Sequence, residues 1–186
     1  MGELKRCFIA LDLPRNAINE IKRIQKLIKE KVIFTGKLTE VENLHLTLKF
    51  LGEIDEGKIK EIKDKLSKIK INQEEVRDFF AELGKIGMFS KKMPKIVWIK
   101  LNGKIVFELQ EKIDDVLRGL FEPEHRFMSH ITIARVRYVE DKKGFNEYLE
   151  SIKPKKIRFK VEDFILKKSE LFSEGPVYED IMKYKL

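Results

Sequence analysis

The stretch His45-Leu46-Thr47-Leu48 recurs 85 positions later as His130-Ile131-Thr132-Ile133. Successive side chains of a β-strand point to opposite faces of the sheet. Each copy therefore places an imidazole and a hydroxyl on one face and two aliphatic side chains on the other. Two such strands facing each other would form a cleft with two titratable imidazoles and two hydroxyl donors, which suits proton transfer around a phosphate.

The repeat extends beyond the two tetrapeptides. At the same offset Asp55-Glu56 matches Glu140-Asp141, and with a slightly larger shift Phe8–Leu11 matches Ile96–Ile99. Two copies are too few for a solenoid. We expect one two-lobed domain spanning residues 1–186, built from a duplicated unit.

The apolar pattern alternates between strand-like and helix-like segments. The strand-like segments are 8–11, 32–38, 44–50, 77–86, 96–101, 127–135, 157–166 and 180–186, and the helix-like segments are 14–28, 59–69, 105–120 and 145–149. This order predicts an α+β fold with two pseudosymmetric antiparallel β-sheets, helices on their outer faces and a central cleft. Gly52 is expected to end the first histidine strand in a turn, and 89–95 to be a loop.

Composition excludes several classes of protein. With 42% hydrophobic residues the chain is not expected to be disordered. It has no run of membrane-spanning length and no secretory pattern, so a cytosolic monomer that binds no membrane is expected. The single cysteine, Cys7, excludes an intramolecular disulfide and is interpreted as core filler.

Charge gives a weaker indication of the partner. The net charge of +8 suits a polyanion such as RNA. However, 38% of the residues are charged, a composition typical of hyperthermophile proteins. We therefore expect a thermostable protein and give the charge little weight as evidence for RNA.

The sequence lacks the residues that a zinc site, a serine nucleophile or an ATP-binding loop would need. A zinc site needs further ligands, and His125 and Cys7 are the remaining histidine and cysteine, with no metal-binding spacing between them. No nucleophile-elbow or Walker-type motif occurs. We therefore expect neither a metal nor a cofactor.

Arginines cluster near the second motif. In a regular strand Arg126 would share the face of His130, four residues away, and is a candidate phosphate ligand. Arg135 and Arg137 have the opposite parity, so they would either brace the sheet or reach the cleft past the end of the strand. Of these two we take Arg135 as a further substrate-binding candidate.

Hydroxyl and aromatic side chains complete the candidate site. Thr47 and Thr132 can donate hydrogen bonds to non-bridging phosphate oxygens and stabilise developing charge. Phe50 and Phe89 flank the expected cleft, and exposed aromatic rings can stack on bases of single-stranded RNA.

Flanking segments carry a family resemblance. They include Arg6-Cys7-Phe8-Ile9-Ala10-Leu11, Asn43-Leu44 and Phe50-Leu51-Gly52 around the first motif, and Arg126-Phe127-Met128-Ser129 before the second. With both motifs they resemble the two-histidine phosphoesterase superfamily, and in particular the RNA 2′,3′-cyclic phosphodiesterases historically named 2′-5′ RNA ligases. Ser129 stands where that family commonly has proline, and Lys95 where arginine is common.

The resemblance implies a bilobal antiparallel fold and metal-free hydrolysis of RNA 2′,3′-cyclic phosphate ends, tRNA-derived ends among them, to 2′-phosphomonoesters. It makes His45 the proton donor and His130 the acceptor, although near symmetry leaves this order open in the sequence. Thr47 and Thr132 would bind the phosphate. Three alternatives stay open: 2′-5′ ligation at the same site, a non-catalytic RNA-end-binding module, and small cyclic nucleotides as substrates.

Overall fold

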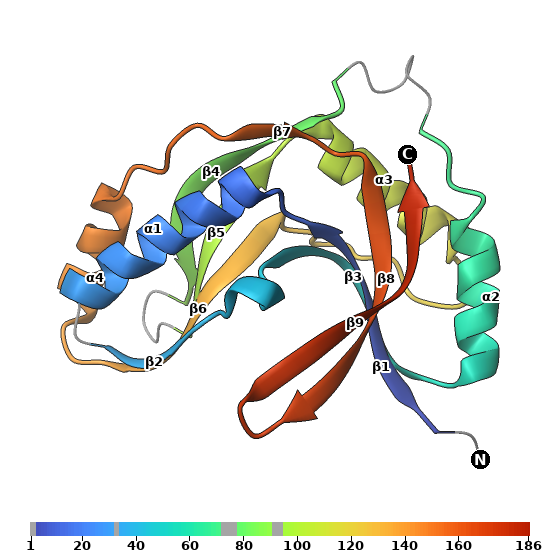
Figure 1. Ribbon diagram of the computed structural model, residues 1–186, viewed down its shortest axis with the longest axis horizontal. Coiled ribbons are helices and arrows are strands. Elements are labelled where there is room, and N and C mark those ends of the chain that lie inside the picture. Colours follow the sequence, from blue (N-terminus) through green and yellow to red (C-terminus); the bar gives the residue numbers. More distant parts are fainter. Residues whose placement is uncertain (1–2, 32–33, 72–77, 91–94) are drawn as a thin grey trace.

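Strands and helices alternate along the computed structural model, which describes residues 3–31, 34–71, 78–90 and 95–186 (Figure 1). The strands are β1 Lys5–Asp12, β2 Phe34–Leu38, β3 His45–Ile54, β4 Phe80–Phe89, β5 Ile96–Asn102, β6 His130–Val139, β7 Arg158–Lys160, β8 Asp163–Phe172 and β9 Gly175–Lys185. The helices are α1 Arg15–Lys31, α2 Glu56–Leu66, α3 Lys104–Val116 and α4 Lys142–Ser151, with a short 3₁₀ helix at Val41–Asn43.

All pairings in the sheet are antiparallel, in the order β7-β4-β5-β6-β3-β1-β8-β9, with β2 also on β6. The α+β class and antiparallel pairing are therefore confirmed. The two expected sheets are joined into one, because β3 and β6 pair at Leu46–Ile131. Beyond this single pair β3 diverges, and β2 pairs with β6 from Ala134 to Val139.

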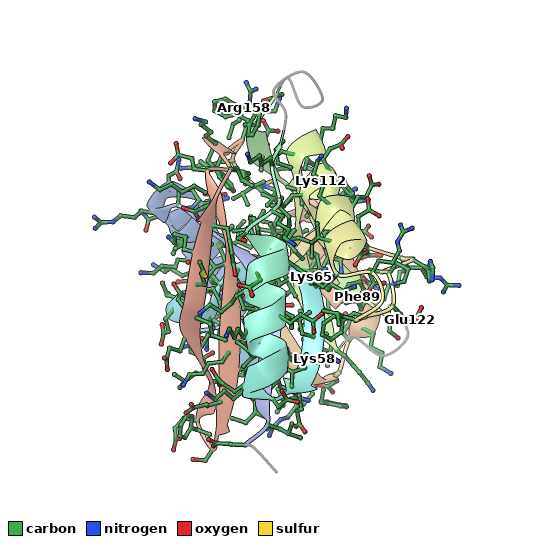
Figure 2. The ribbon with its side chains drawn as sticks, turned by 90° about the vertical axis from the view of Figure 1, so that its right-hand side faces the viewer. Lys58, Lys65, Phe89, Lys112, Glu122 and Arg158 are labelled. Atoms are coloured by element: carbon green, nitrogen blue, oxygen red, sulfur yellow. The ribbon has the colours of Figure 1, made fainter. Side chains whose placement is uncertain are left out.

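Helices cover each half of the sheet. α1 buries an apolar stripe of Ala17, Ile21, Ile24 and Ile28, and its Gln25 amide donates to the carbonyls of Thr39 (2.8 Å) and Ile133 (2.9 Å) beside β2 and in β6. α4 lies next to α1 (Figure 1). α3 packs on β3, and α2 packs beside α3. Figure 2 shows the side of the molecule that α2 and α3 cover, with Lys58 and Lys65 on α2 and Lys112 on α3.

The two histidine strands are followed by similarly capped helices. The Asp55 carboxylate accepts from the backbone N–H of Lys58 at 2.9 Å before α2, and the Asp141 carboxylate accepts from that of Gly144 at 2.9 Å before α4. Carboxylates at these positions satisfy amides that the first turn leaves unpaired. Both caps come from the acidic pairs that match in the sequence.

Several expected boundaries are wrong. β3 does not end at Gly52 but continues to Ile54. Gly52 has a left-handed φ of +74°, which glycine adopts without steric cost, so the strand passes through an irregular stretch there instead of turning. The segment expected as one strand over 157–166 is β7 and the beginning of β8. The strand expected over 77–86 is β4, which extends to Phe89; Arg77 and most of the expected loop, 91–94, lie outside the described residues.

Candidate active site

The two histidine motifs open β3 and β6 and line one cavity. His45, Thr47, His130 and Thr132 all contribute to the lining of a cavity of about 780 Å³. Leu46 and Ile131 form the β3–β6 pair, so the residues on either side of each project together on the opposite face. The structure therefore brings together the four residues that the repeated tetrapeptide predicts.

A bulge in each strand changes which later side chains face the cavity. In β3 the register with β1 skips Leu48, and Leu48 and Lys49 are both buried. In β6 the register with β5 skips Ile133, and Ile133 and Ala134 are both buried. An extra residue of this kind reverses the alternation beyond it.

This reversal corrects the expectation from a regular strand. Arg135 and Arg137 line the cavity instead of facing away from it, and Phe50, which is 74% exposed, lines it from β3. Arg126 does not line the cavity; it lies exposed in the loop before β6. Phe89 is not part of the lining either, but its ring lies edge-on to His130 with the centroids 5.0 Å apart.

His45 is enclosed by aromatic rings and oriented by two hydrogen bonds. Its Nδ1 lies 2.8 Å from the Asn43 carbonyl and its Nε2 lies 2.9 Å from Thr47 Oγ1. Since a carbonyl can only accept, Nδ1 carries the proton and the neutral ring presents its Nε2 lone pair to the threonine hydroxyl. Phe8 packs at 5.0 Å, and Tyr178 packs edge-on at 5.1 Å.

His130 is oriented in the same way. Its Nδ1 lies 2.7 Å from the Met128 carbonyl, so its Nε2 is also the atom available to a ligand. Just before it, the buried Ser129 hydroxyl donates to the Leu101 carbonyl on β5, and the Leu101 amide donates to the Ser129 carbonyl at 3.4 Å. The serine hydroxyl, which a proline would lack, thus adds a hydrogen bond at the entry to the histidine strand.

The proton affinity of His45 is strongly perturbed. Burial is the main cause that lowers the pKa of its imidazole to about 4, and it outweighs the raising effect of the Asn43 carbonyl. The Lys167 ammonium also lowers this pKa, whereas the Asp12 carboxylate raises it. Lys167 is nearly buried and forms ion pairs with Asp12 (3.0 Å) and Asp180 (2.6 Å). In the free protein at neutral pH, His45 is therefore uncharged.

The tip of the β8–β9 hairpin closes one side of the cavity. The Asn43 side-chain amide donates to the Pro176 carbonyl at 2.9 Å, and Lys37 donates to the Glu174 carbonyl and pairs with Glu40. Asn43 thus connects the hairpin to His45 through its own carbonyl. The family resemblance extends to Gly175-Pro176-Val177-Tyr178, but the sequence assigns no role in the site to the hairpin or to Tyr178, because these contacts join segments more than 130 residues apart.

Comparisons with known proteins identify the family of this chain. The LigT like Phosphoesterase family model matches residues 11–98 and 102–178. The chain belongs to the LigT-like phosphoesterase family. It is 36% identical to the RNA 2′,3′-cyclic phosphodiesterase of Methanocaldococcus jannaschii, covering 96% of this chain and 99% of the relative. It is 35% identical to the protein of the same name from Thermotoga maritima, covering 94% and 91%.

Solved structures of similar proteins share the fold. A protein of Thermus thermophilus superposes with a TM-score of 0.79 at 25% identity, covering 97% of both chains. Escherichia coli LigT superposes with a TM-score of 0.75 at 21% identity, covering 100% of this chain and 99% of LigT. The LigT-like fold is thus present along the whole chain.

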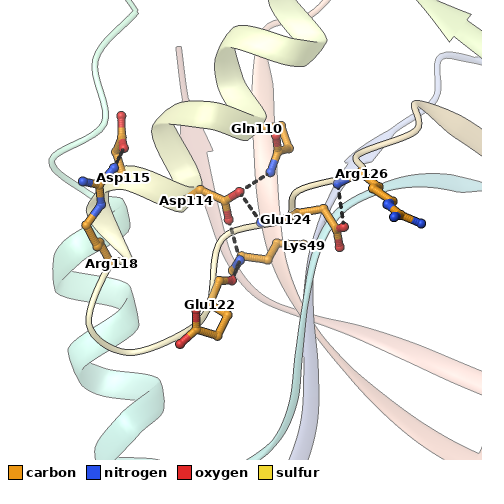
Figure 3. Close-up of polar contacts among 8 residues, drawn as sticks. All are labelled: Lys49, Gln110, Asp114, Asp115, Arg118, Glu122, Glu124 and Arg126. Carbon is orange, nitrogen blue, oxygen red and sulfur yellow. Dashed lines mark hydrogen bonds and ion pairs between the residues drawn. The ribbon is translucent and has the colours of Figure 1, made fainter.

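A buried polar network in this LigT-like protein connects β3 to α3 and to the loop that precedes β6. The Lys49 ammonium, placed on the buried face by the β3 bulge, pairs with the Asp114 carboxylate and donates to the Glu122 carbonyl at 2.8 Å. Asp114 also accepts from the Gln110 side chain (2.6 Å) and from the Glu124 amide (2.8 Å) (Figure 3). Lys49 thereby fixes the segment that leads into His130.

Neither a metal site nor a membrane segment emerges from the described chain. Within residues 3–31, 34–71, 78–90 and 95–186, no cluster of three His, Cys, Asp or Glu side chains could hold a metal ion. In those same ranges, every helix is too short or too polar to cross a bilayer. Cys7 is buried, and burial raises the pKa of its thiol to about 11, which fits a packing role.

Proposed function

We propose that this protein hydrolyses RNA 2′,3′-cyclic phosphate ends to 2′-phosphomonoesters without a metal ion. The observation that carries the proposal is the convergence of two imidazoles and two threonine hydroxyls on one cavity beside Arg135. The names of the relatives from Methanocaldococcus jannaschii and Thermotoga maritima support the substrate. This set of groups supplies a proton acceptor, a proton donor and hydrogen-bond donors to phosphate oxygens.

The reaction is one displacement at phosphorus. The Nε2 of one histidine takes a proton from water as the water oxygen bonds to phosphorus. The bond from phosphorus to the 3′ oxygen breaks, and the Nε2 of the other histidine gives that oxygen its proton. Each ring is held for this by its Nδ1 bond to a backbone carbonyl, 2.8 Å to Asn43 and 2.7 Å to Met128.

Charge on the phosphate is stabilised by three side chains. Thr132 donates to a non-bridging oxygen, and Thr47 does so once its hydroxyl turns from His45 Nε2 to the phosphate. The Arg135 guanidinium can contact two oxygens at once. The bound anion also raises the pKa of His45, because an opposite charge nearby favours the protonated imidazole. Phe50, exposed on the cavity wall, offers a face on which a base can stack.

The test is product analysis with an RNA oligonucleotide that ends in a 2′,3′-cyclic phosphate, in the presence of EDTA. The expected result is a 2′-phosphate end with the wild type and, with His130→Ala, a rate lower by about 10²–10⁴-fold. His125→Ala is the matched control, because His125 is exposed and does not line the cavity. Turnover that needs added zinc would overturn the metal-free mechanism, and a lengthened RNA would indicate ligation by an RNA hydroxyl in place of water.

A further inference from the structure

The cavity continues well beyond the paired histidines. Arg6 lines it from β1 and Arg137 lines it from β6. Arg137 follows His130 by seven residues, and Arg6 pairs in register with Glu53, eight residues beyond His45. At the rise of a strand, both arginines are anchored roughly 20 Å from the histidines. A single nucleotide at the histidines would not extend this far.

The two arginines lie on opposite walls of the cavity. β3 leaves β6 after the Leu46–Ile131 pair, and β1 pairs along β3 while β2 pairs along β6. Arg6 therefore belongs to the β1–β3 wall and Arg137 to the β6–β2 wall. A strand of RNA that leaves the histidines along this cavity would pass between the two guanidinium groups.

Both guanidinium groups lack an acidic partner within the described residues. Arg6 and Arg137 are both exposed. In the part of the chain that the structure describes, neither of them forms an ion pair. Neighbouring cations are paired: Lys5 with Glu56 at 2.8 Å, and Lys168 with Glu179 at 2.8 Å. The cavity carboxylate of Glu40 is paired with Lys37. Two unpaired guanidiniums in a cavity suit an anionic ligand.

We propose that Arg6 and Arg137 form a second subsite, which binds a phosphodiester linkage upstream of the RNA's cyclic end. This inference rests on the proposed function and deepens it. It makes the protein selective for oligoribonucleotides over 2′,3′-cyclic mononucleotides, because a mononucleotide has no upstream phosphate. Cyclic mononucleotides still react at the histidines, but they gain nothing from this subsite.

The test compares kcat/KM for a 2′,3′-cyclic mononucleotide and for a trinucleotide with the same cyclic end. With the trinucleotide, Arg6→Gln and Arg137→Gln each lower kcat/KM by about tenfold, mainly through KM, since each loses a charge-assisted contact. With the mononucleotide both variants match the wild type. Arg118→Gln is the control for net charge, because Arg118 is exposed after α3 and does not line the cavity.

A neutral linkage sharpens the test. Replacing one upstream phosphate of the trinucleotide by a methylphosphonate removes its charge. The linkage that contacts the arginines is the one whose replacement slows the wild type by about tenfold and leaves the Arg6→Gln/Arg137→Gln variant almost unaffected. Equal losses on mononucleotide and trinucleotide, or no loss on either, would overturn the subsite.

Failure of the proposed function gives a different result. If the proposed function is wrong, the wild type turns over neither the cyclic mononucleotide nor the trinucleotide. The subsite is then judged by fluorescence anisotropy with a labelled trinucleotide. Weaker binding by the double variant, with a shallower dependence on salt, supports the subsite. Unchanged binding overturns it.

Discussion

β3 and β6 have the same construction and different surroundings. Each has ten residues, begins with a motif histidine and alternates buried and exposed positions in an identical pattern. Each has a bulge after the motif threonine, and each orients its histidine through a backbone carbonyl two residues earlier. We propose that this likeness reflects duplication of one unit within a single domain.

The surroundings of the two strands differ in charge and in packing. Asp12 pairs in register with His45, whereas Lys100 pairs in register with His130. His45 is enclosed by Phe8 and Tyr178 and hydrogen-bonded to Thr47, whereas the one ring centred within 5.0 Å of His130 among the described residues is Phe89. A duplicated strand thus supplies two imidazoles, and the neighbours of the first lower the pKa of His45 to about 4, mainly through burial.

The largest effect is expected from removing either imidazole. His45→Asn and His130→Asn should each lower kcat for cyclic phosphate hydrolysis by about 10²–10⁴-fold, because each removes one proton transfer from the same displacement. The double variant should lose little more than the slower single variant, since the pair acts as a unit. Steady-state kinetics measure this. Near wild-type turnover by either single variant would break the equivalence of the two strands.

Lys49, at the bulge of β3, should be sensitive to substitution. Lys49→Met should lower the free energy of unfolding by about 3–5 kcal/mol, because it leaves the Asp114 carboxylate unpaired in a buried site. Burial raises the pKa of Asp114, but Lys49, the Glu124 amide and Gln110 together lower it below its ordinary value. Urea unfolding measures the loss.

Two further variants test the cause of that loss. Lys49→Met/Asp114→Leu should recover most of the stability, because it removes both buried charges. Lys5→Met breaks an ion pair whose Glu56 side chain is 74% exposed, and it should change the free energy of unfolding far less than Lys49→Met does, because solvent screens an exposed pair. A double variant as unstable as Lys49→Met would show that the network's backbone contacts, rather than the unpaired charge, determine the loss.

The low pKa of His45 should make stability fall in mild acid. In the folded protein this pKa is lowered to about 4 from its ordinary value of 6.5, so between these pH values the unfolded chain binds more protons. The contribution is complete above about pH 6.5 and is lost as the pH falls toward 4, by at most about 3 kcal/mol. Denaturant unfolding at several pH values should show this slope for the wild type and a smaller one for His45→Gln. Equal slopes would contradict it.

The sequence predicted the histidine strands well because their information is local. A tetrapeptide with period-two alternation fixes the face of His45, and its recurrence fixes that of His130. The regular-strand assumption failed one bulge later, where Arg135 and Arg137 turn into the cavity. The double apolar step at Ile133 and Ala134 was a signal for that bulge, and it could have been read.

The enclosure of His45 by aromatic rings could not be predicted from such local patterns. Tyr178 reaches His45 because β8 pairs with β1, and β9 then pairs with β8. This arrangement depends on which strands become neighbours, which hydrophobic periodicity does not specify. The same holds for Lys49. The alternation of a regular strand would place it on the face of His45 and Thr47, whereas the bulge turns it to the buried side, where it pairs with Asp114 on α3.

The smallest expected effect separates the two ring environments. Tyr178→Ala should admit water to His45 and raise its pKa by on the order of one unit, because desolvation is the main cause of the low value. Phe89→Ala changes the corresponding ring beside His130 and should leave the titration of His45 where it was. NMR titration of the imidazole protons, assigned with His45→Gln, measures both. A His45 titration that moves equally in both variants would mean that a general loosening of the cavity, rather than the Tyr178 ring, controls its proton affinity.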